Sequence, residues 1–476
     1  MTTRRGRRLV ALVVACVLAT AACSGGSDDE AAEDAATEEA AIPTDLTGAD
    51  LAAEAYVAGS PLVVSVRTLQ RLGGLVGVNQ LFWQNALAGP TSRVVVAPNR
   101  DTLYSIAVLD LRAEPMALTL PAVTDRYYTY QLLDAWTESF AYIGTRATGG
   151  RAGTWVITPP GWEGELPAGA ERLESPTPQV FLLGRFLVDD DADIPNATAI
   201  STRTTLQPLS ALTGTTPAPP PPPLGEPAGT AQDIPTDATF FDELGDALAI
   251  DPPTTPAQQE LFVQAEQLGI GAGEHPAEAA DPAQRAVLDD GAAAGDRRIT
   301  DQIDSVGERV NGWSVNLGVG RYGDDLLTRA VVARVGWGAN VADEAVYPIA
   351  RADADGAPLD GANTYRITFP AGGLPPVEAF WSLSVYGDDM FFTEHPSGRY
   401  SIGDRTPDLA FGEDGSLEIV LSHEQPAAAA DGAATNWLPV PDGPFVLMLR
   451  LYLPAQVVIG GDYELPPVEP VDPPAS

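Results

Sequence analysis

The sequence predicts a mainly β protein of the α+β class, in which two antiparallel modules of the β-sandwich or jelly-roll type are joined by a helical segment. Short apolar runs bounded by Gly, Pro, Asn or Asp recur through residues 51–212 and again from residue 311, a pattern typical of antiparallel strands. The 46 glycines and 43 prolines favour turn-rich β structure over long helical bundles. A chain of 476 residues, 45% of them apolar, is long enough for two modules with cores of their own.

The N-terminal 50 residues predict an export signal followed by a solvated stalk. Four arginines precede the apolar run Leu9–Ala22, which is shorter than the roughly 20 residues needed to span a bilayer, so residues 1–22 are interpreted as a signal peptide. The run ends at Thr20-Ala21-Ala22-Cys23, which is similar to the lipobox of bacterial lipoproteins and predicts lipidation of Cys23. An ordinary signal-peptidase site nearby is the alternative. Residues 23–50 are acidic and Ala-rich without an apolar period, so we expect a disordered stalk.

The first β module is expected over residues 51–212. It opens with a helix-like stretch at 51–72, and strand-like runs follow at 93–97, 103–109, 127–133, 154–158 and 180–188. Residues 213–235 contain five consecutive prolines, Pro219–Pro223, which favour polyproline II and predict a semi-rigid linker.

A helical segment and a second β module complete the chain. In residues 236–310 Ala, Glu, Gln and Asp predominate and apolar positions recur at helical spacing, so we expect two or three helices packed across the two modules. The β pattern returns over residues 311–476, with strand-like runs at 364–369, 380–386, 416–421 and 444–453.

Composition excludes several kinds of chemistry. All 27 basic residues are Arg, so a Schiff-base lysine, a P-loop lysine and a pyridoxal-phosphate enzyme are impossible. The net charge of −38 makes nucleic acid a poor partner, because a phosphate backbone needs a basic surface. Two cysteines and three widely spaced histidines, His275, His395 and His423, show no metal-ligand spacing. We therefore predict no metal and no cofactor.

Two further motifs are interpreted as turns. Gly318–Gly323 matches G-x-G-x-x-G, but no βαβ pattern surrounds it, and Asp324 and Asp325 would repel a phosphate at the start of the following helix. The run Asp353-Ala354-Asp355-Gly356 lacks the further ligands that a calcium-binding EF-hand loop requires.

Several long motifs resemble a family of uncharacterised bacterial proteins. The stretches Ala97–Ser105, Asp110-Leu111 and Arg126–Tyr128 resemble the DUF1254 signature. Its usual partner, DUF1214, is similar to the stretches Asn311–Trp313, Tyr322–Asp324, Arg329-Ala330, Pro375–Ser382, Asn436–Pro439 and Leu449–Tyr452. The resemblance implies an exported, mostly β, two-module protein with a helical insert, and no established reaction. Family members often carry a His after the position of Asn79-Gln80, whereas this chain reads Leu81–Gln84, so a mechanism that depends on that His is absent.

The first module offers two groups of candidate site residues. Asn99, Asp101 and Tyr104 would present an amide, a carboxylate and a phenol to a ligand; alternatively, this loop uses its Asn and Asp to satisfy backbone N–H groups. Asp134 and Glu138 would place two carboxylates together for acid–base work on a sugar or ester, and ordinary surface acids are the alternative. The catalytic candidates are Asp101, Asp134 and Glu138.

The second module offers aromatic side chains and one unusual arginine. Trp381, Tyr386, Trp437 and Tyr452 could form a stacking platform for a carbohydrate or another ring, or could be core packing. Arg450 interrupts an apolar run, so it needs a partner if it is buried, and Glu378 is expected to be that partner. Functionally, Arg450 would act as a buried anion clamp. The ligand-binding candidates are Asn99, Asp101, Tyr104, Tyr128, Trp381, Tyr386, Trp437 and Arg450.

Together these observations predict an outward-facing lipoprotein of the bacterial envelope, held at the membrane surface by lipid on Cys23. Its leading function is the binding of a small molecule or glycan in a cleft between the modules. The alternative is a carboxylate-dependent hydrolase acting on a glycan or an ester. A second carboxylate beside Asp101 or Asp134 in a pocket, with a raised pKa, would favour the enzyme.

Overall fold

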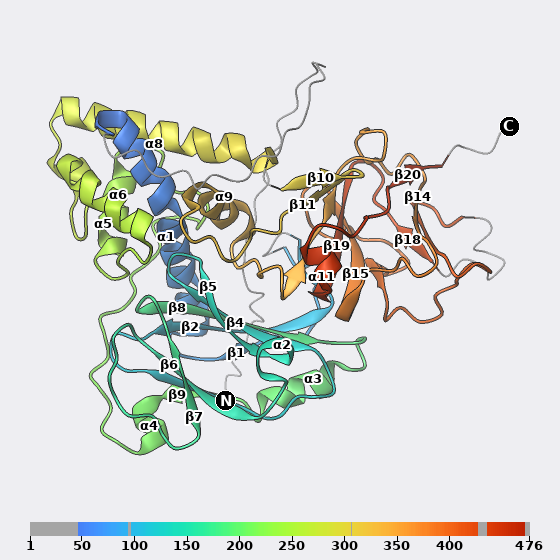
Figure 1. Cartoon of the computed structure of the whole chain (residues 1–476), viewed down its shortest axis with the longest axis horizontal. Coiled ribbons are helices and arrows are strands. Elements are labelled where there is room, and N and C mark those ends of the chain that lie inside the picture. Colours follow the sequence, from blue (N-terminus) through green and yellow to red (C-terminus); the bar gives the residue numbers. More distant parts are fainter. Residues whose placement is uncertain (1–45, 94–96, 306, 427–435, 472–476) are drawn as a thin grey trace, which may run out of the picture.

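The computed structural model describes residues 46–93, 97–305, 307–426 and 436–471, arranged as a helical body and two β modules (Figure 1). The predicted signal peptide, Cys23, nearly all of the stalk and most of the strand expected at 93–97 lie outside the described residues. Among the described helices, none is long and apolar enough to cross a membrane.

The first β module is a sandwich of two sheets. The larger sheet has the order β1-β2-β8-β4-β5, with antiparallel neighbours throughout: β1 (Phe82–Trp83), β2 (Thr102–Asp110), β8 (Gln179–Leu187), β4 (Tyr128–Asp134) and β5 (Ser139–Gly144). The smaller sheet has the order β7-β6-β3-β9, in which only β6 and β7 are parallel: β7 (Ala170–Glu174), β6 (Gly153–Thr158), β3 (Met116–Leu120) and β9 (Thr205–Pro208). Three short helices complete it: α2 (Thr145–Thr148), α3 (Ile194–Ser201) and α4 (Leu209–Thr213).

The larger sheet is buried on both faces, which explains why its strands read as continuous apolar runs. In β2, Ala107 and Leu109 pack against the smaller sheet, whereas Ile106 and Val108 pack against the helical body. Successive side chains of a strand point to opposite faces, so each run fills two cores at once.

The second β module is also a sandwich. Its larger sheet has the order β10-β11-β13-β19-β15-β16, with β12 also paired to β19: β10 (Glu308–Val310), β11 (Trp313–Val315), β13 (Ile349–Ala350), β19 (Phe445–Pro454), β15 (Val377–Gly387), β16 (Ser401–Gly403) and β12 (Ala345–Val346). Its smaller sheet has the order β18-β17-β14-β20: β18 (Trp437–Pro439), β17 (Leu417–Ser422), β14 (Tyr365–Phe369) and β20 (Glu469–Pro470). The short helix α11 (Gln456–Ile459) follows β19. The mainly β, two-module fold predicted from the sequence is confirmed.

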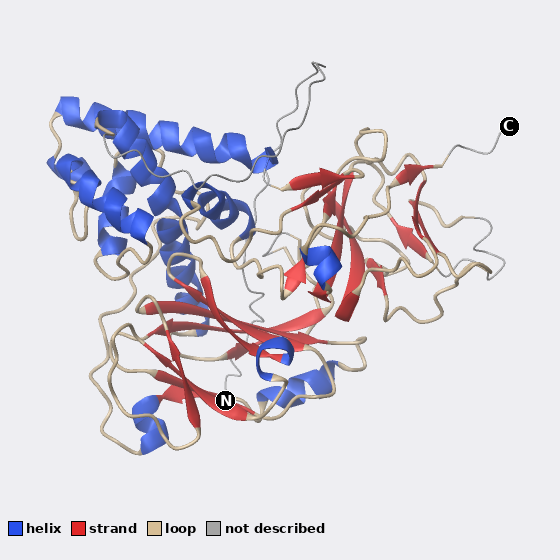
Figure 2. Ribbon diagram, viewed as in Figure 1, coloured by secondary structure: helices blue, strands red, loops and turns tan. Residues whose placement is uncertain are grey.

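The helices pack around the N-terminal helix α1 (Gly48–Val76) and form a helical body (Figure 2). The sequence predicts, instead, helices that pack across the two sandwiches. Within the described part of residues 236–310 there are four α-helices, more than the two or three expected: α5 (Thr239–Leu248), α6 (Pro256–Ala265), α7 (Pro276–Ala279) and α8 (Pro282–Gln302). Two 3-10 turns, Glu266–Leu268 and Ile303–Ser305, follow α6 and α8. Helix α9 (Leu326–Gly336) also joins this body, and its residues share one apolar core with α1 and the larger sheet of the first module.

The proline-rich linker is fixed against the first module. The Gln70 side chain donates to the Leu224 carbonyl at 2.8 Å, and Arg112 donates to the Pro222 carbonyl at 2.6 Å. The buried Arg67 donates to the carbonyls of Thr230 and Asp233. The linker is therefore anchored along α1 and beside β2.

Both motifs interpreted as turns are loops in the structure. Gly320 has a φ of +82°, and the following helix is capped by Asp325, whose side chain accepts from the Thr328 N–H. The Asp353 carboxylate accepts from the N–H groups of Asp355 and Ala357 within its own turn.

Close packing of α1 on α8 depends on two glycines. A Cβ at Gly291 would lie 2.3 Å from the Ala52 Cβ, and a Cβ at Gly295 would lie 2.8 Å from the Tyr56 Cβ. Distances this short force the helices apart or strain their side chains.

We expect Gly291→Ala to lower the free energy of unfolding by about 1–3 kcal/mol, because the added methyl overpacks the α1–α8 contact. Gly74→Ala is the matched control, since Gly74 is also helical and its Cβ would meet no atom within 4 Å. In that open position alanine should be neutral or stabilising by up to about 1 kcal/mol. Chemical denaturation of both variants measures the difference, and equal unfolding midpoints would refute the assigned role of Gly291.

Candidate functional site

The polar motifs of the two modules meet in the structure. The Asn99 side-chain amide donates to the Tyr452 Oη at 2.9 Å, and the Tyr386 hydroxyl donates to the Pro98 carbonyl at 2.8 Å. Arg450 donates to the Ala97 carbonyl at 3.0 Å. The loop that precedes β2 is thus held directly against β15 and β19.

Strand alternation explains which residues reach this contact. In β19, Leu447, Leu449 and Leu451 fill the core of the second sandwich, which places Arg450 and Tyr452 on the opposite face. In β15 the same alternation turns Ser382 toward Asp101 and leaves Trp381 in the core. Ser382 and Arg450 are direct partners in the β15–β19 pairing, so both strands present polar side chains to the first module.

Asp101 is a buried anchor between the modules. Its carboxylate accepts from the Ser382 hydroxyl at 2.7 Å and pairs with Arg405 at 2.6 Å. Its own N–H donates to the Asn99 Oδ1 at 2.6 Å. Asp101 is therefore occupied by protein partners on both of its carboxylate oxygens.

Two buried guanidinium groups at this interface form no ion pair with a carboxylate of the described residues. Arg185 in β8 is 6% exposed and donates to the Gln131 Oε1, the Asn340 Oδ1 and the Gly338 carbonyl. Arg450 is 2% exposed and donates to the Ser384 Oγ, the Ala97 carbonyl and the Tyr386 Oη. The other buried arginines of the described chain, Arg67 and Arg329, both form ion pairs, with Glu243 and Glu138. A buried charge without a counter-charge is costly, so the contrast requires an explanation.

Tyrosines surround these two arginines. Tyr104 is the cross-strand partner of Arg185, whose guanidinium lies 5.9 Å from the centre of the Tyr104 ring. Tyr347 accepts from the Asn340 amide at 2.8 Å and packs edge-on against Tyr452. Burial raises the pKa of Tyr452 well above its ordinary value, so this phenol stays neutral. Tyr104 and Tyr347 are half-buried, and they connect the buried arginines with the surface. We call Asn99, Tyr104, Arg185, Tyr347, Arg450 and Tyr452 the inter-module cluster.

The acidic groups near the inter-module cluster are already paired. Glu344 accepts from the Tyr127 hydroxyl at 2.8 Å and pairs with Arg146 at 2.7 Å. Asp101 pairs with Arg405. Neither acid forms an ion pair with Arg185 or Arg450, although Asp101 is close enough to contribute to the electrostatic environment of Arg450.

Three candidate ligand residues lie away from the inter-module cluster. Tyr128 stacks on Phe186 in the core of the first sandwich, with ring centres 5.3 Å apart. Trp381 packs on Phe369 in the core of the second sandwich. The Trp437 indole donates to the Ser422 carbonyl at the smaller sheet. Tyr128 and Trp381 thus face the cores of the sandwiches. Trp437 lies on the other face of the smaller sheet, opposite to the core residue Leu438, and packs edge-on against His395.

The pairing expected between Glu378 and Arg450 is wrong. Glu378 is exposed, whereas Arg450 is buried and bonded to Ser384, Tyr386 and the Ala97 carbonyl. Glu378 lies at the irregular start of the β15–β19 pairing, where the register shifts between Val377 and Phe380. This irregularity lies well before Ser382, the residue opposite Arg450.

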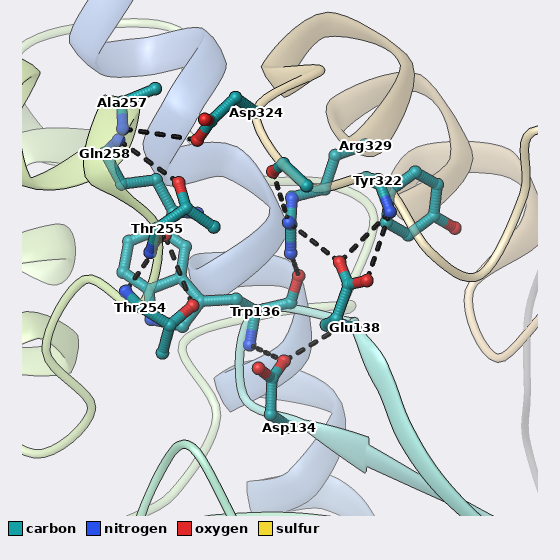
Figure 3. Close-up of polar contacts among 11 residues, drawn as sticks. Asp134, Trp136, Glu138, Thr254, Thr255, Ala257, Gln258, Tyr322, Asp324 and Arg329 are labelled. Atoms are coloured by element: carbon teal, nitrogen blue, oxygen red, sulfur yellow. Dashed lines mark hydrogen bonds and ion pairs between the residues drawn. The ribbon is translucent and has the colours of Figure 1, made fainter.

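Asp134 and Glu138 do not face one another (Figure 3). The Asp134 Oδ1 accepts from the N–H groups of Trp136 and Glu138, both at 2.9 Å, and so closes the turn between β4 and β5. The Glu138 carboxylate is directed at Arg329, which it meets at 2.8 Å, and at the Tyr322 N–H. Asp134 therefore fixes the backbone of the turn, and Glu138 forms an ion pair with a buried arginine.

Arg329 joins three parts of the fold around that turn (Figure 3). It is fully buried in α9 and also donates to the carbonyls of Trp136 and Gly323, each at 2.8 Å. The neighbouring helix α6 begins with a capping box between Thr255 and Gln258, and its Ala257 N–H donates to Asp324. The turn, α6 and the loop before α9 are thus bonded to one another.

Asp134 has a second buried acid near it, Asp251. The Asp251 Oδ1 accepts from the Gln179 N–H at 3.0 Å, and within the described residues the Oδ2 atoms of both acids lack a hydrogen-bond partner. Burial raises the pKa of Asp134 to about 7 and the pKa of Asp251 to about 8. Both groups are carboxylic acids at mildly acidic pH in the folded protein.

These shifts predict that stability falls as pH rises. The folded state binds more protons than the unfolded state between the ordinary Asp pKa of about 3.9 and the raised values, so the free energy of unfolding decreases across that window. We expect the free energy of unfolding to decrease less with pH in Asp251→Asn. The stability of the variant relative to the wild type should therefore increase as the pH rises from 5 to 8. The gain cannot exceed about 1.4 kcal/mol per pH unit for one proton.

Urea unfolding at several pH values in that range measures the effect. Glu260→Gln, which changes an exposed acid on α6, is the control and should run parallel to the wild type. Parallel curves for Asp251→Asn as well would mean that Asp251 does not titrate in this window.

The sequence interpretation missed Arg185 and Tyr347. Arg185 interrupts the apolar run at 180–188 in the same way that Arg450 interrupts its own run, so the signal that identified Arg450 was present. Tyr347 lies in a Pro- and Ala-rich stretch without a motif, and only the fold brings it to Asn340.

Comparison with known proteins supports the resemblance. Residues 78–208 match the family described as protein of unknown function (DUF1254), and residues 344–456 match protein of unknown function (DUF1214). The crystal structure of the VPA0106 protein from Vibrio parahaemolyticus is similar to the chain, with 24% sequence identity, a TM-score of 0.69, and coverage of 90% of this chain and 100% of that one. A crystal structure of an uncharacterized protein from Burkholderia cenocepacia has 15% identity and a TM-score of 0.42, over 88% of this chain and 87% of that one. No curated protein matches the chain.

The first matched region contains all strands of the first sandwich, the second contains most strands of the second sandwich, and the Vibrio structure shares the fold over nearly the whole length. The chain belongs to the DUF1254/DUF1214 domain-containing proteins.

Proposed function

We propose that the protein is a lipid-anchored binding protein of the bacterial envelope that takes a small molecule or glycan with a carboxylate group at the inter-module cluster. The observation that carries this proposal is the pair of buried arginines, Arg185 and Arg450, without a carboxylate partner among the described residues. A ligand carboxylate would supply the missing counter-charge.

Chemistry at the cluster suits a carboxylate. A guanidinium group presents a planar fork of N–H donors that matches two carboxylate oxygens. The half-buried side chains of Tyr104 and Tyr347 add hydroxyl groups near Arg185. The strongly acidic remainder of the protein repels small anions, so an anion is favoured only where positive charge is concentrated.

Galacturonate and galactose form a matched pair of probes for this proposal, because both are sugars and only the first carries a carboxylate. Galacturonate should raise the thermal midpoint of the wild type, by the equivalent of about 2.7 kcal/mol at a hundredfold excess over Kd, and galactose should not. Arg185→Gln should weaken galacturonate binding at least tenfold. Tyr104→Phe, which removes one half-buried hydroxyl, should weaken it several-fold and tests the site without removing a buried charge.

Arg151→Gln is the control, because Arg151 is an exposed arginine of the same module that pairs with Glu171. A carboxylate site elsewhere would give equal galacturonate affinity in the wild type, Arg185→Gln and Tyr104→Phe. The absence of any shift with galacturonate in the wild type would reject uronates as the ligand class.

Export and anchoring rest on the basic N-terminal residues, the apolar run Leu9–Ala22 and the lipobox-like stretch that ends at Cys23. Metabolic labelling with a radioactive fatty acid tests this part of the proposal. The wild type should be labelled and Cys23→Ser should not, and an unlabelled wild type would exclude the anchor.

The carboxylate-dependent hydrolase is supported less well. The observations in its favour are the raised pKa of Asp134 and the second buried acid near it, Asp251, whose pKa is also raised; both shifts come from burial. However, Asp134 closes a backbone turn and Glu138 is paired with Arg329. Neither acid lines the 380 Å³ cavity or the 240 Å³ pocket of the second module.

A further inference from the structure

The second module contains a cavity of about 380 Å³ on the side of β19 that faces its own core. The cavity lies between the β10–β11 hairpin, the loop after β11, β12, β19 and the segment that begins with α11 (Figure 1). Its size falls within the range of about 300–1,000 Å³ that is usual for small-molecule sites. Arg450 and Tyr452 point to the opposite face of β19, so this cavity is separate from the inter-module cluster.

The walls of the cavity are mainly apolar. Leu451, Val346, Val458 and Leu465 belong to the buried core of the module, and the half-buried Val315 and Leu317 close the outer side. An apolar gap of this kind leaves the side chains around it without contact partners, and an apolar ligand restores those contacts.

The polar groups at the cavity disfavour an anion. Glu308 is the one charged residue among those that line it in the described chain, and it is acidic. The Tyr463 hydroxyl donates to the Gly373 carbonyl at 3.0 Å, so its oxygen remains able to accept a hydrogen bond from a ligand hydroxyl. The protein as a whole carries a charge of −38, which adds to the repulsion of a carboxylate.

Helix α11 carries apolar side chains both at the cavity and at the molecular surface. Helix α11 contributes Val458 to the wall and exposes its neighbour Val457, which is 41% accessible. Val457 is one of four large apolar side chains that are exposed in the described chain.

We propose that this cavity is a second binding site, which takes a neutral lipid-like molecule with an alkyl chain and a terminal hydroxyl. The alkyl chain lies against Val315, Leu451 and Val458, and the hydroxyl donates to the oxygen of Tyr463 or to Glu308. This cavity is proposed to bind a neutral ligand, whereas the inter-module cluster is proposed to bind a carboxylate. The proposal for the cavity does not depend on the proposal for the cluster.

A fluorescent dye tests the site. N-phenylnaphthylamine is neutral and fluoresces when it enters an apolar cavity. The wild type should bind the dye, dodecanol should displace it, and dodecanoate at pH 8 should displace it at least tenfold less well. Val315→Trp, which fills the outer side of the cavity, should weaken dye binding at least tenfold, whereas Val263→Trp, at an exposed position on α6, should have no effect.

Glu308→Gln provides a test that does not threaten the fold, because Glu308 is exposed. It should improve displacement by dodecanoate several-fold and leave displacement by dodecanol unchanged. Absence of dye binding in the wild type, or equal binding in Val315→Trp, would overturn the site. Equal displacement by dodecanol and dodecanoate in the wild type would overturn the preference for a neutral ligand. Galacturonate should not displace the dye, which separates this site from the inter-module cluster.

Discussion

Replacing Arg329 with Ala should lower the free energy of unfolding by about 3–5 kcal/mol, the largest loss that we expect from a single substitution in this protein. The Arg329 guanidinium is fully buried and bonds Glu138 together with the carbonyls of Trp136 and Gly323. Its removal leaves Glu138 without its counter-charge and two carbonyls without donors, and it opens a cavity in the contact between α9 and the β4–β5 turn. Urea denaturation followed by tryptophan fluorescence measures the loss.

Arg321→Ala is the matched control, since Arg321 lies just before the same helix and pairs with Asp343 on the surface. An exposed pair of this kind contributes about 0–1 kcal/mol. Arg329→Lys should recover only part of the loss, because an ammonium group cannot reach three acceptors in one plane. A loss below about 1 kcal/mol in Arg329→Ala would show that the three contacts are not coupled to folding.

Asp101→Ala should lower the free energy of unfolding by about 3 kcal/mol, because it removes a buried carboxylate that bonds both Ser382 and Arg405 in the other module. It also removes a negative charge close to Arg450, whose own electrostatic environment includes Asp101. The variant should therefore bind galacturonate more tightly than the wild type does, although it is less stable. Denaturation with and without the ligand measures both effects.

Asp389→Ala is the control for this prediction. Asp389 forms an exposed ion pair with Arg93 that also links the two modules, so it matches Asp101 in connectivity and differs in burial. We expect a loss of less than about 1 kcal/mol and unchanged galacturonate affinity. A similar loss in both variants would mean that burial does not determine the strength of the inter-module contacts.

Secondary structure and the order of modules could be predicted because they depend on local patterns. The apolar runs of β2, β4, β8 and β19 are bounded by turn residues, and α1 has a helical stretch without strand-like alternation. The position of α1 could not be predicted, because its partners α5, α8 and α9 lie far away in the chain. No local pattern in α1 distinguishes a helix that caps one sandwich from one at the centre of a helical body.

The candidate site was predicted in part, for a similar reason. The dense polar motif identified Asn99 and Tyr104, and the interruption of an apolar run identified Arg450; the fold brings the three into one cluster. Trp381 was grouped with them as an aromatic side chain on a strand, yet adjacent strand residues face opposite sides, and it is Ser382 that faces the first module. Which side faces the other module depends on sheet packing, and that information is not contained in the spacing of one strand.

The central place of α1 has a consequence for the order in which the polypeptide can acquire its structure. The residues that cover α1 belong to α5, α8 and α9, so the last of them leaves the ribosome more than 250 residues after α1 does. Until then the apolar side chains of α1 that α9 covers are exposed on the nascent chain. A gene fragment that stops after the first sandwich should therefore give an insoluble product, although that sandwich has a core of its own.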